Sequence, residues 1–214
     1  QLEDELGRVE TRAIQGQGTE TLSYDSKGRL SSIVNDMGTF TWAYNAATSR
    51  PSTLTFPNDM VLELSYGGVN DDLSLSRLHY KDSSAATLAD YVFTRRDDGR
   101  IDGWSNSQTG DDWDIFYDDA GRLIEVEDGG VSQYSYTYDG LGRQTGIYDN
   151  VESPTTRRVT WSYDQTGAKG QLASSSRWTD SGANEYKTRV LGYTALYQPT
   201  GEEYTIPASE TGLA

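Results

Sequence analysis

Apolar and polar residues alternate along much of the chain, in short runs separated by glycine, aspartate and serine. A period of two, with aromatic and branched side chains on one face, predicts β-strands with one buried face. No apolar pattern at helical spacing extends beyond about two turns. The sequence therefore predicts an all-β fold. The clearest runs are Phe40, Trp42 and Tyr44; Leu62, Leu64 and Tyr66; Trp113, Ile115 and Tyr117; Tyr134, Tyr136 and Tyr138; and Val159, Trp161 and Tyr163.

A short phrase, Tyr-Asp-x-x-Gly-Arg, closes several of these runs. It occurs at residues 24–29, 117–122 and 138–143, and a second alternating run follows it. An aspartate at the first turn position can accept hydrogen bonds from amides two residues on, and glycine tolerates positive φ. Each phrase is therefore predicted to be the turn of an antiparallel hairpin. The predicted structural residues are Tyr24, Asp25, Gly28, Arg29, Tyr117, Asp118, Gly121, Arg122, Tyr138, Asp139, Gly142 and Arg143.

The arginine that ends the phrase has two candidate partners. It can lie back over the aspartate of its own turn, or over a neighbouring tyrosine ring. Either contact is worth about 0.5–1 kcal/mol at an exposed position. We expect this arginine to hold the register between neighbouring hairpins.

Weaker copies of the phrase lie at residues 6–9, 97–101 and 161–167. Recurrence at roughly 20 to 30 residues is typical of repeat proteins, in which each unit packs only on its neighbours. Residues 1–214 are therefore predicted to form one continuous array, a fragment of a longer protein since no initiating methionine opens it. Longer loops are expected at residues 67–72, 82–90 and 150–157.

The composition limits the core and the partners. Only 35% of the residues are apolar, so we expect a thin core built as a ladder from 15 tyrosines and 5 tryptophans. A net charge of −15 disfavours nucleic acid and anionic membrane surfaces. The absence of cysteine excludes disulfides and thiolate sites. No apolar run is long enough for membrane insertion.

Candidate chemistry is sparse. His79 is the only histidine and is predicted to be a strand residue rather than a base or a metal ligand. Carboxylate pairs among Asp111, Asp112 and Asp114, or Glu125 with Glu127, could serve glycoside hydrolysis, but solvated strand faces are the favoured interpretation. The acidic segments 70–72 and 111–114 could ligate calcium, but neither matches the Asp-x-Asp-x-Asp-Gly loop.

We therefore predict no enzyme activity, no cofactor and no metal. Trp104 and Trp178 lie outside the runs that end in Tyr-Asp. These two tryptophans are the candidates for contact with a ligand such as a glycan.

The phrase, followed by an alternating strand, resembles the Tyr-Asp (YD) repeat of the Rhs family, most clearly at residues 22–34, 115–127 and 136–149. Such repeats occur in bacterial polymorphic toxins, the B and C components of Tc toxins, wall-associated proteins and teneurins. The resemblance implies a long curved or spiralling sheet of hairpins, which in the toxins forms a shell around an effector. The family's self-cleaving segment carries an Asp-Pro pair, and none occurs here.

The leading hypothesis is a non-enzymatic wall segment of such a shell, in a secreted or surface-exposed bacterial protein. A second hypothesis is a building block of an extracellular fibre or stalk, resembling a β-solenoid. A third is an adhesin that binds glycan or protein partners. The expected partners are flanking repeats or further copies of the chain, through self-association, and an encapsulated effector.

Overall fold

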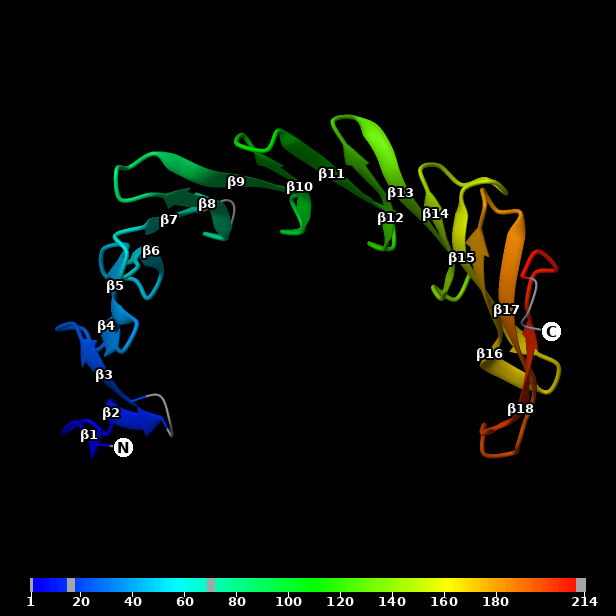
Figure 1. Ribbon diagram of the computed structural model, residues 1–214, viewed down its shortest axis with the longest axis horizontal. Helices are drawn as coiled ribbons and strands as arrows, with labels where there is room; N and C mark the ends of the chain where they lie inside the picture. Colours follow the sequence, from blue (N-terminus) through cyan, green and yellow to red (C-terminus); the bar gives the residue numbers. More distant parts are fainter. Residues whose placement is uncertain (1, 15–17, 69–71, 211–214) are drawn as a thin grey trace. The chain divides into compact units, whose positions relative to one another are not determined.

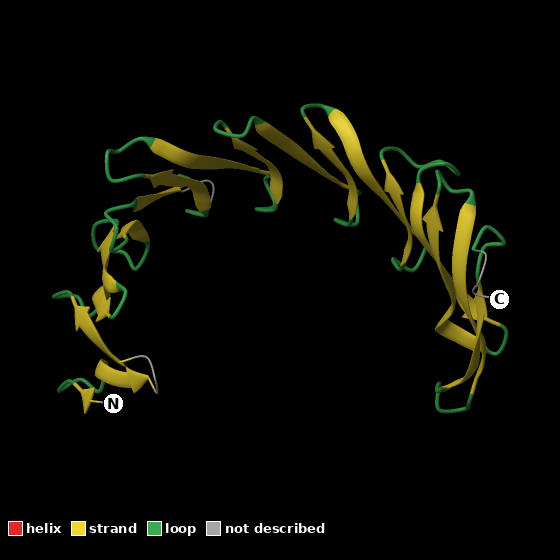
Figure 2. Ribbon diagram, in the orientation of Figure 1, coloured by secondary structure: helices red, strands yellow, loops and turns green. Residues whose placement is uncertain are grey.

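The computed structural model describes residues 2–14, 18–68 and 72–210. Within these ranges the chain forms eighteen strands and no helix (Figure 2). It follows that no described segment is a helix capable of crossing a membrane. The all-β prediction is confirmed. The residues fall into two compact units, 1–112 and 113–214.

In the first unit each strand pairs antiparallel with the next strand of the chain (Figure 1). The strands are β1 (Leu2–Glu3), β2 (Val9–Ile14), β3 (Gly18–Tyr24), β4 (Leu30–Asn35), β5 (Gly38–Tyr44), β6 (Pro51–Thr55), β7 (Val61–Tyr66), β8 (Leu75–Lys81), β9 (Thr87–Arg95) and β10 (Ile101–Asn106). The predicted hairpin thus becomes a continuous ladder, because both edges of each interior strand are used.

The second unit repeats this arrangement, and its first strand, β11, starts two residues before the unit itself begins at Trp113. Each strand again pairs antiparallel with its successor. The strands are β11 (Asp111–Tyr117), β12 (Leu123–Asp128), β13 (Val131–Tyr138), β14 (Gln144–Asp149), β15 (Arg157–Gln165), β16 (Ala168–Thr179), β17 (Asn184–Tyr193) and β18 (Pro199–Thr205).

The turns that carry the phrase follow odd-numbered strands. The copy at 25–29 joins β3 to β4, the copy at 118–122 joins β11 to β12, and the copy at 139–143 joins β13 to β14. Successive hairpin turns alternate between the two edges of an antiparallel ladder. Within each unit, all copies of the phrase therefore lie along one edge, and the turns after even-numbered strands lie along the other.

The core is thin, as the low apolar content predicts. Alternate residues along β5 and β11 are half-buried and exposed, but the half-buried face has no second layer over it in the described residues. Among the large apolar side chains of the described residues, only Val190 and Tyr148 are less than a tenth exposed. Stability must therefore come largely from contacts within the sheet and along its edges.

The three expected loops have different outcomes. The prediction for residues 82–90 is wrong, because Thr87–Asp90 belongs to β9 and only a tight turn at Asp82–Ala86 precedes it. In this turn the Asp82 carboxylate accepts the amides of Ser84 and Ala86, so an aspartate replaces the glycine signal that marks other turns. The 150–157 loop is confirmed over residues 150–156. Residues 69–71 of the 67–72 loop lie outside the described ranges.

Candidate functional site

The phrase folds into a turn that is closed twice by its aspartate. In the first copy the Gly28 amide donates to the Asp25 carbonyl oxygen at 2.9 Å, and the Asp25 amide donates to the Arg29 carbonyl at 2.8 Å. The Asp25 carboxylate Oδ1 accepts the amides of Lys27 and Arg29, each at 2.9 Å. Gly28 has φ +80°. This is a four-residue turn whose last residue has a left-handed backbone conformation. Glycine adopts this conformation with little strain, which explains its place in the phrase.

The same bonds recur at the other two copies. Oδ1 of Asp139 accepts the amides of Leu141 and Arg143, and Asp118 accepts the amide of Arg122 at 2.9 Å. Gly121 and Gly142 have φ +74° and +83°. Tyr117 and Tyr138 end the strands that lead into these turns. The structure therefore places all twelve phrase residues at strand ends and turns.

The arginine contacts both candidate partners at once. Arg29 Nε donates to Asp25 Oδ2 at 2.7 Å, and the guanidinium lies 4.3 Å from the ring centre of Tyr44. The Tyr44 hydroxyl in turn donates to the Leu30 carbonyl oxygen at 2.7 Å. We call this set a clamp: the arginine of one turn, the tyrosine before the next turn, and the carbonyl that follows the arginine. A clamp ties one hairpin to the next.

Five clamps are seen in the described residues. They are Arg8, Tyr24 and Val9; Arg29, Tyr44 and Leu30; Arg50, Tyr66 and Pro51; Arg122, Tyr138 and Leu123; and Arg143, Tyr163 and Gln144. The guanidinium lies 4.3–4.8 Å from the ring centre in four of them and 5.9 Å away for Arg50.

Two degenerate repeats keep the hydrogen bond of the clamp although one residue of the phrase differs, the tyrosine in one repeat and the aspartate in the other. Arg95 occupies the tyrosine position before the turn at 96–100, and its Nη2 donates to the Leu75 carbonyl at 3.1 Å. Tyr193 donates to the Leu172 carbonyl at 2.7 Å. Thr194 follows it, and its hydroxyl oxygen accepts the amides of Leu196 and Gln198, as the aspartate does elsewhere. The motif letters alone did not reveal these equivalents.

Arg143 connects more groups than its counterparts. It donates to Asp139 Oδ2 at 2.6 Å and to both oxygens of Asp164, at 3.0 and 2.6 Å. The Arg143 fork, followed by the Gly170 amide, lowers the pKa of Asp164 far below its usual range. Bidentate pairing of this kind fixes orientation as well as charge.

The turn aspartates have lowered pKa values for the same physical reason. The Arg29 side chain, with the amides of Arg29 and Lys27, lowers the pKa of Asp25. The Arg122 amide and side chain do the same for Asp118. At Asp139, partial desolvation opposes the effect, but the bonds from Arg143 and Leu141 outweigh it and the pKa is lowered.

These shifts predict a loss of stability in acid. A carboxyl group whose pKa is lower in the folded than in the unfolded chain stabilises the fold above its unfolded pKa and loses that effect as the pH falls through the folded value. We expect the thermal midpoint to fall as the pH drops below the ordinary aspartate value of 3.8. In Asp25→Asn the acid-induced fall should be shallower, as measured by circular dichroism between about pH 6 and about pH 2.

Asp119→Asn is the matched control for this experiment. Asp119 lies in the second copy of the phrase, is exposed, and its side chain has no hydrogen-bond partner in the described ranges. Its substitution should leave the acid profile unchanged. An Asp25→Asn profile that runs parallel to the profile of the unmodified chain would contradict the assignment.

His79 belongs to a polar ladder across β7, β8 and β9. Its Nδ1 lies 3.2 Å from Glu63 Oε2, and its Nε2 lies 2.9 Å from Thr87 Oγ1. Lys81 donates to the other Glu63 oxygen at 2.7 Å and, with burial opposing it, lowers the pKa of Glu63. Both ring nitrogens are thus engaged by side chains of neighbouring strands.

The carboxylates singled out by sequence lie on strands. Asp114 pairs in register with Glu127, and Phe116 pairs with Glu125, so the acids of β11 and β12 share one face. Asp111 accepts a hydrogen bond from Thr109. Over residues 2–14, 18–68 and 72–210, no three histidine or acidic side chains gather as a metal site would require. Asn70 and Asp71 of the other calcium candidate lie outside those ranges.

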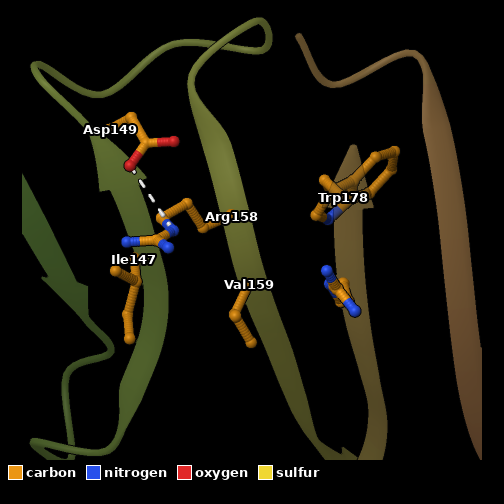
Figure 3. A pocket seen from close by; sticks show the side chains of 6 residues that line it. Ile147, Asp149, Arg158, Val159 and Trp178 are labelled. Atoms are coloured by element: carbon orange, nitrogen blue, oxygen red, sulfur yellow. Dashed lines mark ion pairs between the residues drawn. The ribbon is translucent and has the colours of Figure 1, made fainter. Parts of the chain in front are cut away.

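The two tryptophans differ in their surroundings. Trp104 packs on Tyr91 of the neighbouring strand, with ring centres 5.9 Å apart. Trp178 is the penultimate residue of β16, donates from Nε1 to Thr160 Oγ1 at 3.0 Å, and lies under the guanidinium of Arg157 at 3.7 Å. It also lines a pocket of about 550 Å³ in the second unit (Figure 3). Its lining residues come from three strands, β14, β15 and β16, and the sequence pattern did not predict that they form a pocket.

The comparisons with known proteins bear on the clamped turns. A family model described as the RHS repeat matches residues 117–151. This segment contains two copies of the phrase and the complete clamp formed by Arg122, Tyr138 and Leu123.

The family match covers residues 117–151 of the 214-residue chain.

Solved structures share its fold. The chain resembles a chain in the structure "Crystal Structure of TcdB2-TccC3-TEV", with a TM-score of 0.65 and 15% identity over 95% of the length of this chain. A TcdB2-TccC3 structure without the hypervariable C-terminal region gives a TM-score of 0.64 and 14% identity over 94% of the chain. The chain spans only 12% of the length of either match. No curated protein sequence matches it significantly.

The Rhs repeat, the all-β ladder and these matches together support a structural role for the segment. The features that define this role are the turns and clamps, and no cluster of reactive side chains lies beside them in the described residues.

Proposed function

We propose that residues 1–214 form one continuous YD-repeat array that serves as a non-catalytic wall segment of a shell enclosing a toxin or effector. The parent protein is secreted or exposed on the bacterial surface. The observation that carries the proposal is the clamp, which recurs in both units and joins hairpin to hairpin. Such links extend a sheet without closing a core, as an enclosing wall requires.

The thinness of the sheet supports this role. With few side chains fully buried, the segment gains little from packing against itself, so further surface must stabilise it. Repeat arrays obtain that surface from adjoining repeats, and open edge strands favour pairing with another strand. The partners we propose are therefore flanking repeats of the same protein, or neighbouring copies, together with the enclosed effector.

Electron microscopy of the purified parent assembly tests the proposal. Hollow closed particles with additional density inside are the expected result. Long filaments with a regular axial repeat would overturn it and favour the fibre or stalk. Glycosidase activity that depends on Asp114 or Glu127 would overturn the non-catalytic assignment.

A further inference from the structure

The last strand of the second unit carries an unfinished clamp. In each of the five clamps, the carbonyl that accepts the tyrosine hydroxyl belongs to the first residue of the strand that follows the turn. β18 begins at Pro199, directly after the turn at 194–198. The Pro199 carbonyl therefore occupies the acceptor position of a further clamp.

The direction of this carbonyl follows from the turn. The Thr194 amide donates to the Gln198 carbonyl oxygen at 2.9 Å, so the Gln198 carbonyl points back across the turn. Carbonyls of consecutive residues in an extended strand point to opposite sides. The Pro199 carbonyl thus points away from β17. In the first copy of the phrase the corresponding carbonyl, that of Leu30, points toward the next strand and accepts the Tyr44 hydroxyl.

The side of β18 that faces away from β17, here called the β18 edge, is open within the described residues of its unit. β18 pairs there with β17 alone, and Figure 1 shows it in red as the last strand of the unit. Six of its seven residues are exposed, whereas all six of β12, which has a neighbour on each side, are half-buried. Tyr204 and Ile206 are left 68% and 46% exposed. An open edge of this kind offers its backbone groups to another strand.

The unfinished clamp specifies which strand fits the β18 edge. Proline has no amide hydrogen, so at Pro199 the edge offers only an acceptor. Pro51 holds the same position in β6 and accepts the Tyr66 hydroxyl at 2.9 Å. The glutamine before Pro199 is no obstacle, because Tyr193 donates to the Leu172 carbonyl at 2.7 Å although a glutamine also precedes Leu172. A strand that ends in tyrosine supplies the donor that this edge lacks.

A second copy of the chain does not supply that donor. The strand that would continue the ladder is its β1, which has two residues and ends in Glu3, directly before the turn at 4–8. Glu3 thus holds the position that tyrosine holds in the phrase. A carboxylate accepts hydrogen bonds but cannot donate them, so Glu3 and the Pro199 carbonyl would face each other as two acceptors.

We propose that the β18 edge binds an antiparallel strand that ends in tyrosine and leads into an aspartate turn, and that it does not bind β1 of a second copy. The tyrosine hydroxyl donates to the Pro199 carbonyl oxygen, and main-chain hydrogen bonds along β18 complete the contact. This rests on the proposed wall function and decides which of its two partners, a flanking repeat or a neighbouring copy, occupies the edge.

A labelled peptide of residues 131–143, added to the full chain, tests the β18 edge. It contains the β13 strand, the final Tyr138 of that strand and the turn that follows. Its one acidic and one basic residue cancel, so charge attraction does not drive binding. Fluorescence anisotropy should show saturable binding with one site per chain. Amide exchange should slow in β18 when the peptide binds and stay unchanged in β12, which is already paired on both sides.

Two variants of the peptide separate the clamp from strand pairing in general. Tyr138→Phe removes the hydroxyl that meets Pro199 and should weaken binding about fivefold, the loss expected for one neutral hydrogen bond. Tyr136→Phe is the matched control, because Tyr136 lies on the same face of the strand two residues earlier and does not reach Pro199. It should bind as the unmodified peptide does.

Sedimentation equilibrium of the chain without peptide tests the second part of the proposal. Association between copies should be at least about tenfold weaker than binding of the peptide, because β1 is short and offers no donor.

Four results would overturn the proposal: absence of saturable binding, slowed exchange only outside β18, equal affinities of the Tyr138→Phe and Tyr136→Phe peptides, or copies that associate as tightly as the peptide and protect β18. The wall proposal fails on a different observation, the shape of the parent assembly in the electron microscope, so the two failures are distinguishable.

Discussion

Gly182→Ala will destabilise the second unit by about 3 kcal/mol, well beyond the usual cost of an alanine at positive φ. Gly182 lies in the turn after β16 with φ +77°, and a Cβ atom there would be 2.0 Å from the carbonyl oxygen of Pro154. That oxygen is backbone and already accepts a hydrogen bond from Arg157. The contact can be relieved only if the 150–156 loop moves. Urea denaturation followed by tryptophan fluorescence measures the loss.

Gly129→Ala separates the two causes. Gly129 also lies in a turn of the second unit at positive φ, +57°, but a Cβ atom there would meet nothing within 4 Å. Its substitution should cost about 1 kcal/mol, which is the conformational strain alone. Amide exchange should also quicken at Asn150 and Thr156 in Gly182→Ala and stay unchanged in Gly129→Ala. Equal losses in the two variants would mean that the two loops are not in contact.

The clamp at Tyr138 gives the second large effect. We expect Tyr138→Ala to cost about 3 kcal/mol, because it removes a half-buried ring, its contact with Arg122 and the bond to Leu123. Tyr138→Phe should cost about 1 kcal/mol, because it removes only the hydroxyl donor. Burial raises the pKa of Tyr138, so the hydroxyl stays protonated and able to donate at neutral pH. Thermal or urea unfolding measures both losses.

Tyr197→Phe is the control for the smaller effect. Tyr197 is 57% exposed, and its hydroxyl has no partner in the part of the chain that the structure describes. Its removal should change stability by less than about 0.5 kcal/mol. If Tyr138→Phe were as mild as Tyr197→Phe, the hydroxyl bond of the clamp would contribute nothing.

Sequence reasoning succeeded where local chemistry decides the structure. Alternating apolar residues predicted the strands, and the phrase placed its aspartate and glycine in turns because both act within a few residues. The partner of Arg29 was left open between its own aspartate and a neighbouring tyrosine. The structure shows that one guanidinium reaches both, because Nε points along the turn while its plane covers the next ring.

The features that were missed depend on contacts between distant segments. Arg95 replaces a tyrosine at the clamp position before the weak copy of the phrase at 97–101, and only the structure reveals that it meets the carbonyl of Leu75. A pocket of about 420 Å³ beside Trp178 is lined in part by the 150–156 loop and the turn after β16, which approach each other at Pro154 and Gly182. Trp178 was singled out because it lies outside the regular runs. The sequence did not predict that arginines lie near it, since the chain as a whole has a strong negative charge.

The placement of the clamps along one edge has a consequence for how this chain can change in length. Each clamp needs its tyrosine and its arginine on the same edge of the ladder, and antiparallel neighbours point in opposite directions. Duplicating or deleting two strands leaves every remaining clamp whole. Duplicating or deleting one strand would send the next tyrosine to the far edge, away from its arginine and its carbonyl. The array can therefore gain or lose strands only in even numbers if every clamp is to remain intact.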